Sequence, residues 1–282
     1  MIVFMKKFIL SIFIIVLIWP SCRSYNPRKV SRKSIKIVTL NVLGWGYDIK
    51  TRSRRISSLL YKTNSDIIFL QEVKPHLMKS LLSSTWVREE YYGMFFPSKR
   101  RPYIGLYILS RYPIYEISYK KLSGIRKIRV LFATVKINDQ EVRIANIHLE
   151  APLDKNHIRA QQLKEVFSYL KDYPYSIIAG DFNFGDKDEP ENRIMHSAFE
   201  DLWQILKPHG KGYTWNMKQN PKAVKNAYEN ETSRRLDRIL FKKEVWEPVN
   251  VKIINHKWPL YYGSSYYPSD HYGLYGELKM IY

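Results

Sequence analysis

The stretch SIIAGDFNFGD, residues 176–186, begins as an apolar strand and ends in polar residues. Its first four residues have the small and β-branched side chains that are typical of a buried strand. Asp181 and Asn183 follow directly. An acid and an amide at the end of a buried strand indicate the rim of a functional site. Such a site needs partner side chains at the ends of other strands.

The composition is that of an ordered globular protein with a large excess of positive charge. Of the 282 residues, 45% are hydrophobic and 15% aromatic, which excludes a disordered chain and allows a sizeable core. There are 46 Lys and Arg against 26 Asp and Glu, a formal charge of +20. Such a charge attracts polyanions, so we expect nucleic acid as a partner, with an anionic membrane surface as the alternative.

The first 22 residues differ from the rest of the chain. Lys6 and Lys7 precede an apolar run at 8–19, which is too short to span a bilayer comfortably and is typical of a signal peptide. A short retained membrane anchor is the alternative. Cys22, the only cysteine, follows the run as at a lipoprotein cleavage site, although Trp19 and Pro20 match such a site poorly. We therefore expect an exported protein, either a membrane-anchored lipoprotein or a secreted or periplasmic protein.

One domain is expected after this segment. Residues 23–33, RSYNPRKVSRK, are polar and basic and have the composition of a tether. Residues 34–282 contain no comparable break, repeat or low-complexity tract, so they are expected to form one monomeric domain.

Short strands alternate with a few helices in this domain. Strands are expected at 34–41, 66–73, 104–110, 129–137, 141–149, 176–181, 235–241 and 271–278, with a hairpin turn at 138–140. Helical periodicity appears at 51–62, 75–84 and 157–172. This order predicts an α+β fold in which two mixed sheets pack on each other and helices cover them outside.

Polar residues recur where these strands end. They are Asn41, Glu72, His148, the pair Asp181 and Asn183, and the pair Asp270 and His271. Asp237 lies inside the apolar strand RRLDRILF. Each has a simple structural explanation when taken singly, such as a turn cap or a surface ion pair. A charged group within an apolar strand is harder to explain, because charges are seldom buried without partners.

Taken together, the segments TLNVLGW, FLQEV, NIHLE, GDFN, RLDRILF and PSDHYGL resemble the endonuclease/exonuclease/phosphatase superfamily. The resemblance implies a deoxyribonuclease-I-like four-layer αββα sandwich. The segments YTWNMKQN at 213–220 and HLEAPLDKNHIRAQQLK at 148–164 are similar to those of the 5′-tyrosyl-DNA phosphodiesterases. Two positions depart from that family: Ala151 stands where a serine is usual, and Gly185 where an arginine is usual. Both departures concern residues that hold substrate phosphate.

The resemblance implies a Mg²⁺-dependent phosphodiesterase, with Mn²⁺ as a substitute ion. Glu72 is the expected metal ligand, with Asp270 and Asn41 in or behind its shell. Asp181 would orient the attacking water, and Asn183 would donate to the water or to phosphate. His271 and His148 would stabilise charge on the phosphoryl oxygens. Asp237 would hold the ring of His271.

Substrate binding is expected at basic and aromatic residues. The clusters SKRRPY (98–103), RKIR (126–129, including Arg129) and SRR (233–235) are candidates for backbone contacts, and Arg159 belongs to the resembling segment. Tyr213 and Trp215 are candidates for stacking on a base or a tyrosyl ring, or else are buried aromatics.

Three other functions remain open from the sequence. They are a secreted nonspecific nuclease, a sphingomyelinase-like lipid or inositol phosphohydrolase, and a catalytically silent binding protein on the same scaffold. The presence of every candidate catalytic residue argues against the last.

Overall fold

A computed structural model describes residues 34–281 except 47, 98–104, 125–127, 255–257 and 260–264. The expected signal segment 1–22, the tether 23–33, the basic cluster 98–103 and the first two residues of the basic cluster 126–129 lie outside the described residues. No helix within the described part of the chain is long and apolar enough to cross a membrane.

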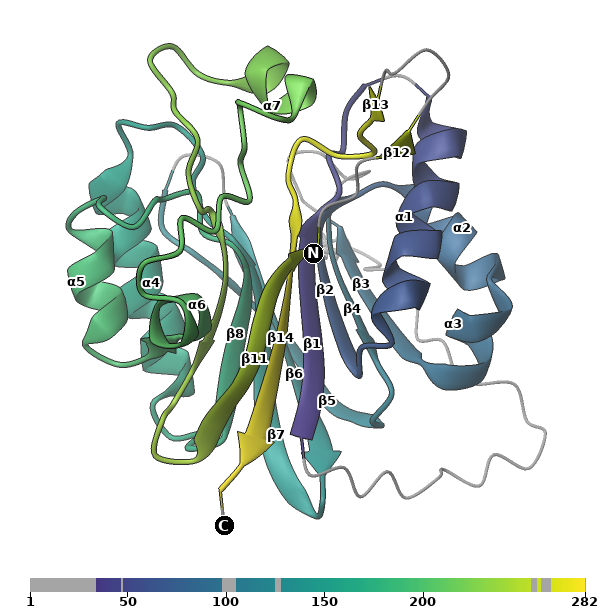
Figure 1. Cartoon of the computed structure of the whole chain (residues 1–282). Helices are drawn as coiled ribbons and strands as arrows, with labels where there is room; N and C mark the ends of the chain where they lie inside the picture. Colours follow the sequence, from purple (N-terminus) through teal and green to yellow (C-terminus); the bar gives the residue numbers. More distant parts are fainter. Residues whose placement is uncertain are drawn as a thin grey trace, which may run out of the picture.

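Two six-stranded sheets form the centre of the molecule (Figure 1). The first sheet has the order β11 (Trp246–Ile254), β14 (Gly273–Met280), β1 (Ser34–Asn41), β2 (Ile67–Val73), β4 (Gly105–Ser110) and β3 (Tyr92–Pro97). The second has the order β5 (Ile114–Lys121), β6 (Arg129–Ile137), β7 (Gln140–His148), β8 (Ser176–Asp181), β10 (Asp237–Phe241) and β9 (Glu200–Asp201). Two short strands, β12 (Trp258–Pro259) and β13 (Ser265–Tyr266), pair separately.

Helices cover the outer face of each sheet, as Figure 1 shows. Against the first sheet lie α1 (Ile49–Thr63), α2 (Pro75–Ser83) and α3 (Thr85–Glu90). On the side of the second lie α4 (Asn156–Leu170), α5 (Glu191–His196) and α6 (Leu202–Leu206), while α7 (Pro221–Asn226) lies beyond the strand ends. The predicted two-sheet α+β fold is thus confirmed.

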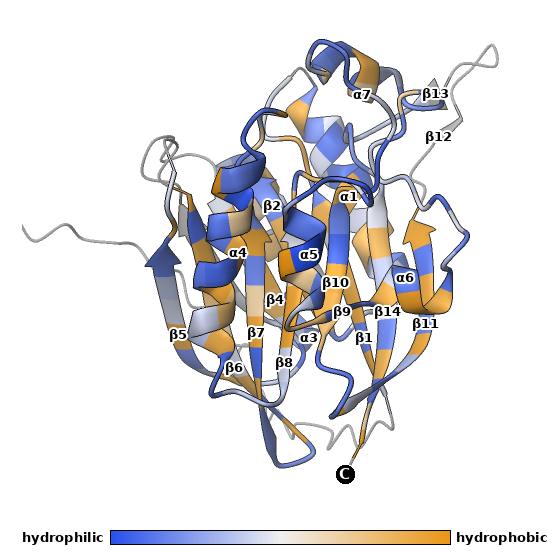
Figure 2. Cartoon of the chain, turned by 90° about the vertical axis from the view of Figure 1, so that its left-hand side faces the viewer, coloured by the Kyte–Doolittle hydropathy of each residue, from blue (hydrophilic) through white to orange (hydrophobic). Residues whose placement is uncertain are grey.

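Apolar residues form a core in each of the three spaces between the four layers. The central core joins residues of both sheets, among them Ile37 and Phe69 of the first and Ile177 and Ile239 of the second. Figure 2 shows the apolar strands of the second sheet behind the largely hydrophilic outer surfaces of α4 and α5. Both sheets are therefore buried on two faces, which explains why their central strands are nearly continuous apolar runs.

The pairing of the central strands places their carboxyl ends together. Strand β1 runs parallel to β2, with Asn41 opposite Gln71. Strand β7 runs parallel to β8, with His148 opposite Asp181. The ends of β1 and β8 meet between the sheets, because the side chains of Asn41 and Asp181 are hydrogen-bonded. Polar residues that follow these strands consequently share one edge of the sandwich.

Candidate active site

Asn41 links the two sheets at this edge. Its Nδ2 donates to Asp181 Oδ2 at 2.9 Å and lies 3.3 Å from Glu72 Oε1. Both Asn41 and Asp181 are almost fully buried. The amide thus bridges two carboxylates that belong to different sheets, and it keeps them near each other at low cost because it donates to both.

Glu72 is aimed at this edge by an irregularity of β2. The β2–β4 register shifts between Leu70 and Val73, and Glu72 has φ 59°, an unusual conformation for a residue with a side chain. Bulges of this kind re-aim a side chain, and local strain of this kind is concentrated at functional sites. Gly44 N donates to Glu72 Oε2 at 2.8 Å, and the side chain keeps 21% of its surface exposed. Glu72 is therefore the carboxylate of the group that solvent and substrate can reach.

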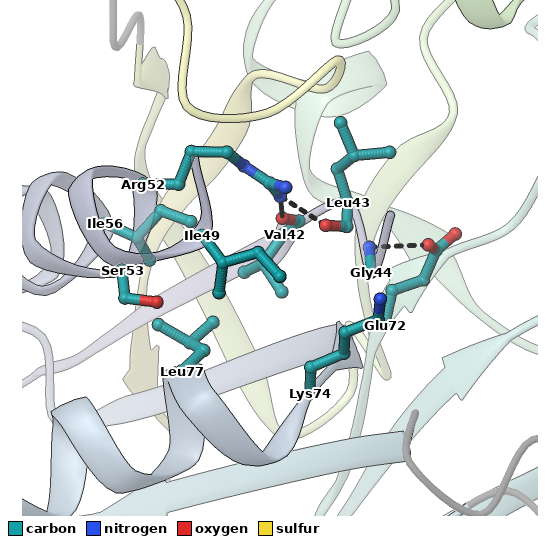
Figure 3. Close-up of a pocket in the computed structure, with 10 residues that line it drawn as sticks. All are labelled: Val42, Leu43, Gly44, Ile49, Arg52, Ser53, Ile56, Glu72, Lys74 and Leu77. Carbon is teal, nitrogen blue, oxygen red and sulfur yellow. Dashed lines mark hydrogen bonds between the residues drawn. The ribbon is translucent and has the colours of Figure 1, made fainter. Parts of the chain in front are cut away.

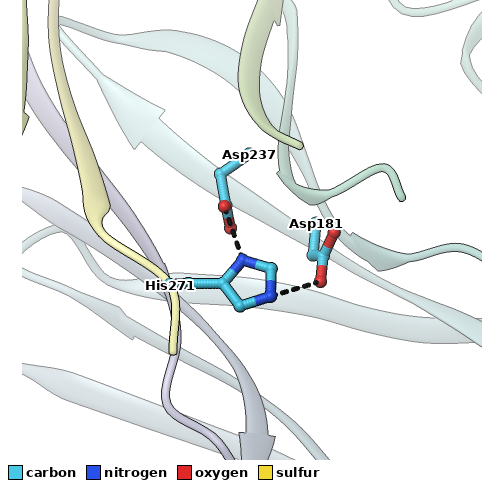
Figure 4. Close-up of side chains that lie close together, drawn as sticks. All are labelled: Asp181, Asp237 and His271. Carbon is cyan, nitrogen blue, oxygen red and sulfur yellow. Dashed lines mark hydrogen bonds and ion pairs between the residues drawn. The ribbon is translucent and has the colours of Figure 1, made fainter. Parts of the chain in front are cut away.

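His271, from the segment just before β14 of the first sheet, lies between Asp237 and Asp181 of the second sheet (Figure 4). His271 Nδ1 lies 2.8 Å from Asp237 Oδ2, and His271 Nε2 lies 3.6 Å from Asp181 Oδ2. Asp181 and Asp237 are neighbours because they pair across β8 and β10. Thr214 Oγ1 accepts from the backbone N–H groups of Leu236 and Asp237, which fixes the start of β10.

Charge on His271 is favoured by these neighbours. Burial alone would lower its pKa, but the carboxylates of Asp237 and Asp181 outweigh burial and raise the pKa of His271 well above its ordinary value. With Nδ1 held by Asp237, the imidazolium presents Nε2–H toward Asp181 and the space beside it. The predicted contact between Asp237 and His271 is therefore present.

His148 completes the group from the end of β7. Its Nε2 lies 3.6 Å from Asp181 Oδ2 and 4.0 Å from Glu72 Oε1. The side chain is 24% exposed, so it stands on the open side of the carboxylates. The structure thus brings together Asn41, Glu72, His148, Asp181, Asp237 and His271, from strands spread over more than 200 residues of chain.

Asn183 and Asp270 lie at the margin of this group. Asn183 N donates to Asp181 Oδ1 at 3.0 Å, and its side-chain Nδ2 donates to Leu149 O at 2.9 Å. Asp270 is buried and accepts from Asn226 Nδ2 at 2.8 Å, and its Oδ1 lies 3.2 Å from Ser269 Oγ. Burial raises the pKa of Asp270. Asp270 is thus held by Asn226 and Ser269, and no hydrogen bond with Glu72 is formed among the described residues.

Two predicted substrate contacts need correction. Arg159 is 1% exposed, and its guanidinium donates to Glu191 and to the backbone oxygens of Glu150, Pro152 and Leu153, so it supports the segment after β7 and cannot reach substrate. Trp215 is 5% exposed and packs edge-on against His271, with ring centroids 5.0 Å apart. Trp215 is therefore a buried aromatic, which was the alternative interpretation of this residue.

The other predicted contacts are placed as follows. Tyr213 is half-buried on the segment just before Thr214. Arg129 begins β6, near the end where β7 delivers His148, but it is 9% exposed and lies over the Tyr119 ring at 5.6 Å. In the cluster 233–235, Arg234 and Arg235 are taken up by ion pairs with nearby carboxylates, so neither is a free cation for a phosphate backbone.

Arg52 is a site residue that the sequence did not reveal. Its Nε donates to Pro268 O at 2.7 Å and its Nη1 to Trp45 O at 2.6 Å. Its Nη2 donates to Val42 O at 2.6 Å and to Leu43 O (Figure 3). This buried guanidinium fastens the loop after β1 to the segment before β14. The only signal in the sequence is a basic residue on the inward side of an expected helix.

Two cavities lie near the described site residues. A cavity of about 20 Å³ lies beneath the loop 42–44 beside Glu72, with room for about one water molecule (Figure 3). A groove of about 420 Å³ begins at the loop after Asn183. Its charged lining residues are of both signs, among them Lys187, Arg234, Asp188 and Glu231. Because its lining includes negative as well as positive side chains, this groove does not have the charge expected of a binding channel for a polyanion.

The residues present fit a divalent metal ion. Asp181, Asp237 and His271 have ligand atoms within 4.8 Å of one another. However, Asp237 is fully buried and its Oδ2 is committed to His271 Nδ1. Glu72 offers a more accessible carboxylate oxygen, and Mg²⁺ is commonly held by one or two carboxylates together with water and phosphate. Among these carboxylates, Glu72 is the one that solvent reaches and whose oxygens are not committed to a histidine.

Residues 38–271 match the endonuclease/exonuclease/phosphatase family over most of the chain. The chain belongs to this family. Among its curated relatives, tyrosyl-DNA phosphodiesterase 2 of Xenopus laevis is 28% identical over 258 residues, which cover 85% of this chain and 66% of that protein. The Mus musculus protein of the same name is also 28% identical, over 88% of this chain and 67% of its own length. This chain thus spans about two thirds of these relatives.

Solved structures agree with the predicted fold. The D. rerio tyrosyl-DNA phosphodiesterase 2 in complex with a single-strand DNA product is 25% identical, with a TM-score of 0.70 over 88% of this chain and 100% of that one. A family protein from Bacteroides thetaiotaomicron has a TM-score of 0.73 at 15% identity, over 88% of this chain and 98% of that chain. The second similarity concerns the fold alone.

Proposed function

We propose that this protein is a Mg²⁺-dependent phosphodiesterase that hydrolyses phosphodiester bonds in nucleic acid, with 5′-phosphotyrosyl DNA as its substrate class. The observation that carries the proposal is the connected group Asp237–His271–Asp181–Asn41–Glu72 at one edge of the sandwich. The relatives named as tyrosyl-DNA phosphodiesterases support the substrate class.

Glu72 would hold the divalent ion, for which Mn²⁺ would also serve. The ion, when bound, supplies positive charge that neutralises the phosphate and polarises its P–O bonds. Asn41 would keep Glu72 and Asp181 at a fixed separation. Asp270 would support this arrangement from behind, through Ser269, whose Oγ donates to Asn41 O at 2.6 Å.

Asp181 would position the attacking water and accept its proton. Its two carboxylate oxygens receive hydrogen bonds from Asn41 Nδ2 and Asn183 N, which fix the direction of the group. The water oxygen forms a bond to phosphorus while the bond from phosphorus to the tyrosyl oxygen breaks. A phenol has a pKa of about 10, so it leaves more readily than a sugar alcohol.

His271 and His148 would stabilise the charge that grows on the phosphoryl oxygens. His271 would act as an imidazolium oriented by Asp237, and His148 stands on the open side of the same carboxylates. Donors that are already oriented stabilise a transition state without reorganisation, and the loss of one costs about 10²- to 10³-fold in rate.

Parallel assays of the purified chain test this proposal. The substrates are 5′-phosphotyrosyl single-stranded DNA, plain duplex DNA and sphingomyelin, each with Mg²⁺ and with EDTA. We expect Mg²⁺-dependent release of tyrosine that leaves a 5′-phosphate. Preferred cleavage of plain DNA or of sphingomyelin would overturn the substrate class, and equal activity in EDTA would overturn the metal role.

Glu72→Gln tests the assignment of the metal-holding carboxylate. We expect the Mg²⁺ concentration for half-maximal activity to rise by about 10-fold or more. Loss of a direct metal ligand should weaken metal binding at least as much as loss of a group that only orients a ligand. Glu116→Gln, at a side chain that is 56% exposed on β5, is the control and should leave this concentration unchanged. An unchanged Mg²⁺ requirement in Glu72→Gln would refute the assignment.

We further propose that residues 1–22 export the domain, either as a lipoprotein attached at Cys22 or in secreted or periplasmic form. The basic and apolar pattern of that segment supports export. Palmitate labelling of the wild-type chain and of Cys22→Ser, followed by fractionation of the cells, tests this. Recovery of the unprocessed wild-type chain in the cytoplasm would rule export out.

A further inference from the structure

We propose that Trp45 and Lys74 form a nucleotide subsite beside Glu72. In this subsite the indole stacks on a base near the scissile phosphate, and the ammonium contacts a backbone phosphate. The inference rests on the proposed function and deepens it, since it places the nucleic-acid strand on the side of the first sheet.

The two side chains lie together at the site. Lys74 Nζ lies 4.4 Å from the centroid of the Trp45 ring, and 46% of Trp45 is exposed. Trp45 follows Gly44, whose N–H donates to Glu72, and Lys74 lies two residues beyond Glu72. Figure 3 shows Lys74 and Glu72 rising to the same side of the turn between β2 and α2. The exposed indole thus belongs to the residue next to Gly44, which contacts the carboxylate proposed to hold the metal.

The backbone that carries the indole is fixed. Arg52 donates to the carbonyl oxygens of Trp45 and Val42, and its own side chain is 5% exposed. Backbone held in this way loses little further freedom when a ligand binds, so an exposed ring mounted on it can contribute most of its stacking energy to affinity.

The chemistry of the pair favours a nucleotide. Stacking on tryptophan accepts any base, because each base has a π face, and a lysine ammonium is a compact charge for a phosphate oxygen. Helix α2, which Lys74 precedes, has no side-chain cap and no acidic residue in its first turn, so its positive end adds to the potential there. The groove of about 420 Å³, which Lys187 and Asp188 line, has mixed charge and lacks this character.

A binding cycle tests the pairing of Trp45 with a base. Fluorescence anisotropy in EDTA measures binding of labelled 5′-phosphotyrosyl oligonucleotides, each with one abasic residue at a successive position from the 5′ end. We expect the wild-type protein to lose about 5- to 150-fold in affinity at one position. Trp45→Leu should bind the intact oligonucleotide more weakly by a similar factor and should show no further loss at that position.

Matched variants complete the design. Tyr115→Leu removes another exposed aromatic, 66% exposed, from the far end of β5 and should retain the wild-type abasic pattern. Lys74→Gln should lower the salt dependence of binding by about one phosphate contact, whereas Lys136→Gln, at a 45% exposed side chain, should not. If Trp45→Leu and the wild-type protein have the same midpoint temperature of thermal unfolding, the fold of the variant is intact.

The outcomes separate this inference from the proposed function. An abasic loss that is equal in wild type and Trp45→Leu at every position would overturn the subsite, even in an active enzyme. The subsite would also be overturned if the affinity depended on the tyrosyl group and no abasic substitution reduced it. Position-specific coupling to Trp45 in a protein that cleaves none of the three substrates would support the subsite and would refute the proposed reaction.

Discussion

Asp237 shows how one buried carboxylate can serve the site without contacting substrate. It is fully buried, its Oδ2 is 2.8 Å from His271 Nδ1, and Trp215 packs against the same imidazole. A buried charge is costly unless it is paired, and the imidazolium is the pair. The contact orients the ring through Nδ1–H, and because the imidazolium carries a proton on both nitrogens, Nε2–H is the proton presented to the site.

Asp237→Asn and His271→Ala should therefore affect turnover as one unit. We expect His271→Ala to lower kcat by about 10²-fold or more on phosphotyrosyl DNA, and Asp237→Asn to lower it by a similar order. The double variant should be little worse than His271→Ala alone, because Asp237 acts through the ring that is then missing. Steady-state kinetics of the four proteins measure the coupling. Multiplied losses in the double variant would show that Asp237 acts independently of His271.

Single residues were predictable from the sequence where the chemistry itself required them. Asn41, Glu72, Asp181 and His271 stand at strand ends, and the fold brings strand ends together. Trp215 was less predictable, because its neighbours decide whether an aromatic is buried. The prediction that Arg159 contacts substrate was wrong for a related reason. Its guanidinium donates to a carboxylate and to carbonyl oxygens from segments that come near it only in the folded chain.

At the scale of elements, β7 and β8 approach each other unusually closely at Gly180. A Cβ atom there would lie 2.0 Å from Ile147 O, and the residue has φ +154°. The glycine of GDFN is thus required by the neighbouring backbone one residue before Asp181. The close approach also sets the separation between Asp181 and His148, which are opposite each other in the β7–β8 register.

Gly180→Ala should destabilise the fold by at least about 3 kcal/mol, because the contact is with backbone that cannot move without shifting β7. Gly185→Ala is the matched control: its Cβ would meet only the Arg234 side chain, at 3.3 Å, and we expect less than about 1 kcal/mol. Urea unfolding gives both values. Equal stability of the two variants would mean that β7 and β8 can separate freely.

Elements with both faces buried were predicted well, and edge elements were missed. The expected strands 129–137 and 176–181 coincide with β6 and β8, whose apolar runs are continuous. By contrast, β5 at a sheet edge has only exposed and half-buried residues, and β11 contains Pro248 at an irregular register. Helices α5, α6 and α7 have only five or six residues, too few for a helical period to stand out.

At the scale of the whole molecule, a buried ion cluster holds the far edge of the second sheet. Asp201 of β9 is fully buried and pairs with Arg235 at 2.8 Å and Arg238 at 2.7 Å. Asp201 also caps α6 by accepting from Trp203 N at 2.9 Å. Breaking a buried ion pair from one side leaves uncompensated charge, which generally costs about 3–5 kcal/mol. The cluster therefore links β9, β10 and α6 in one unit.

Global stability should depend on the ionisation of Asp201. Burial alone would raise the pKa of Asp201, but Arg235 and Arg238 outweigh it and hold that pKa below its ordinary value. The native state then binds this proton more weakly than the unfolded chain, whose Asp has a pKa of about 3.9. The stability contributed by the charged form is present above that pH and is lost as the pH falls through the lower native pKa.

Urea unfolding of wild type and Asp201→Asn between pH 7 and pH 2.5 measures this contribution. We expect a difference of about 3–5 kcal/mol at pH 7 that shrinks once the pH falls below about 4, because the wild-type carboxyl then becomes neutral like the amide. Asparagine keeps one oxygen for the helix cap, but it removes the charge and replaces the oxygen that accepts from the arginines with an NH2 donor. Asp186→Asn, at a side chain that is 35% exposed and contacts the same arginines, should cost much less. A difference between wild type and Asp201→Asn that stays constant down to pH 2.5 would show that the ion cluster does not carry the stability of this edge.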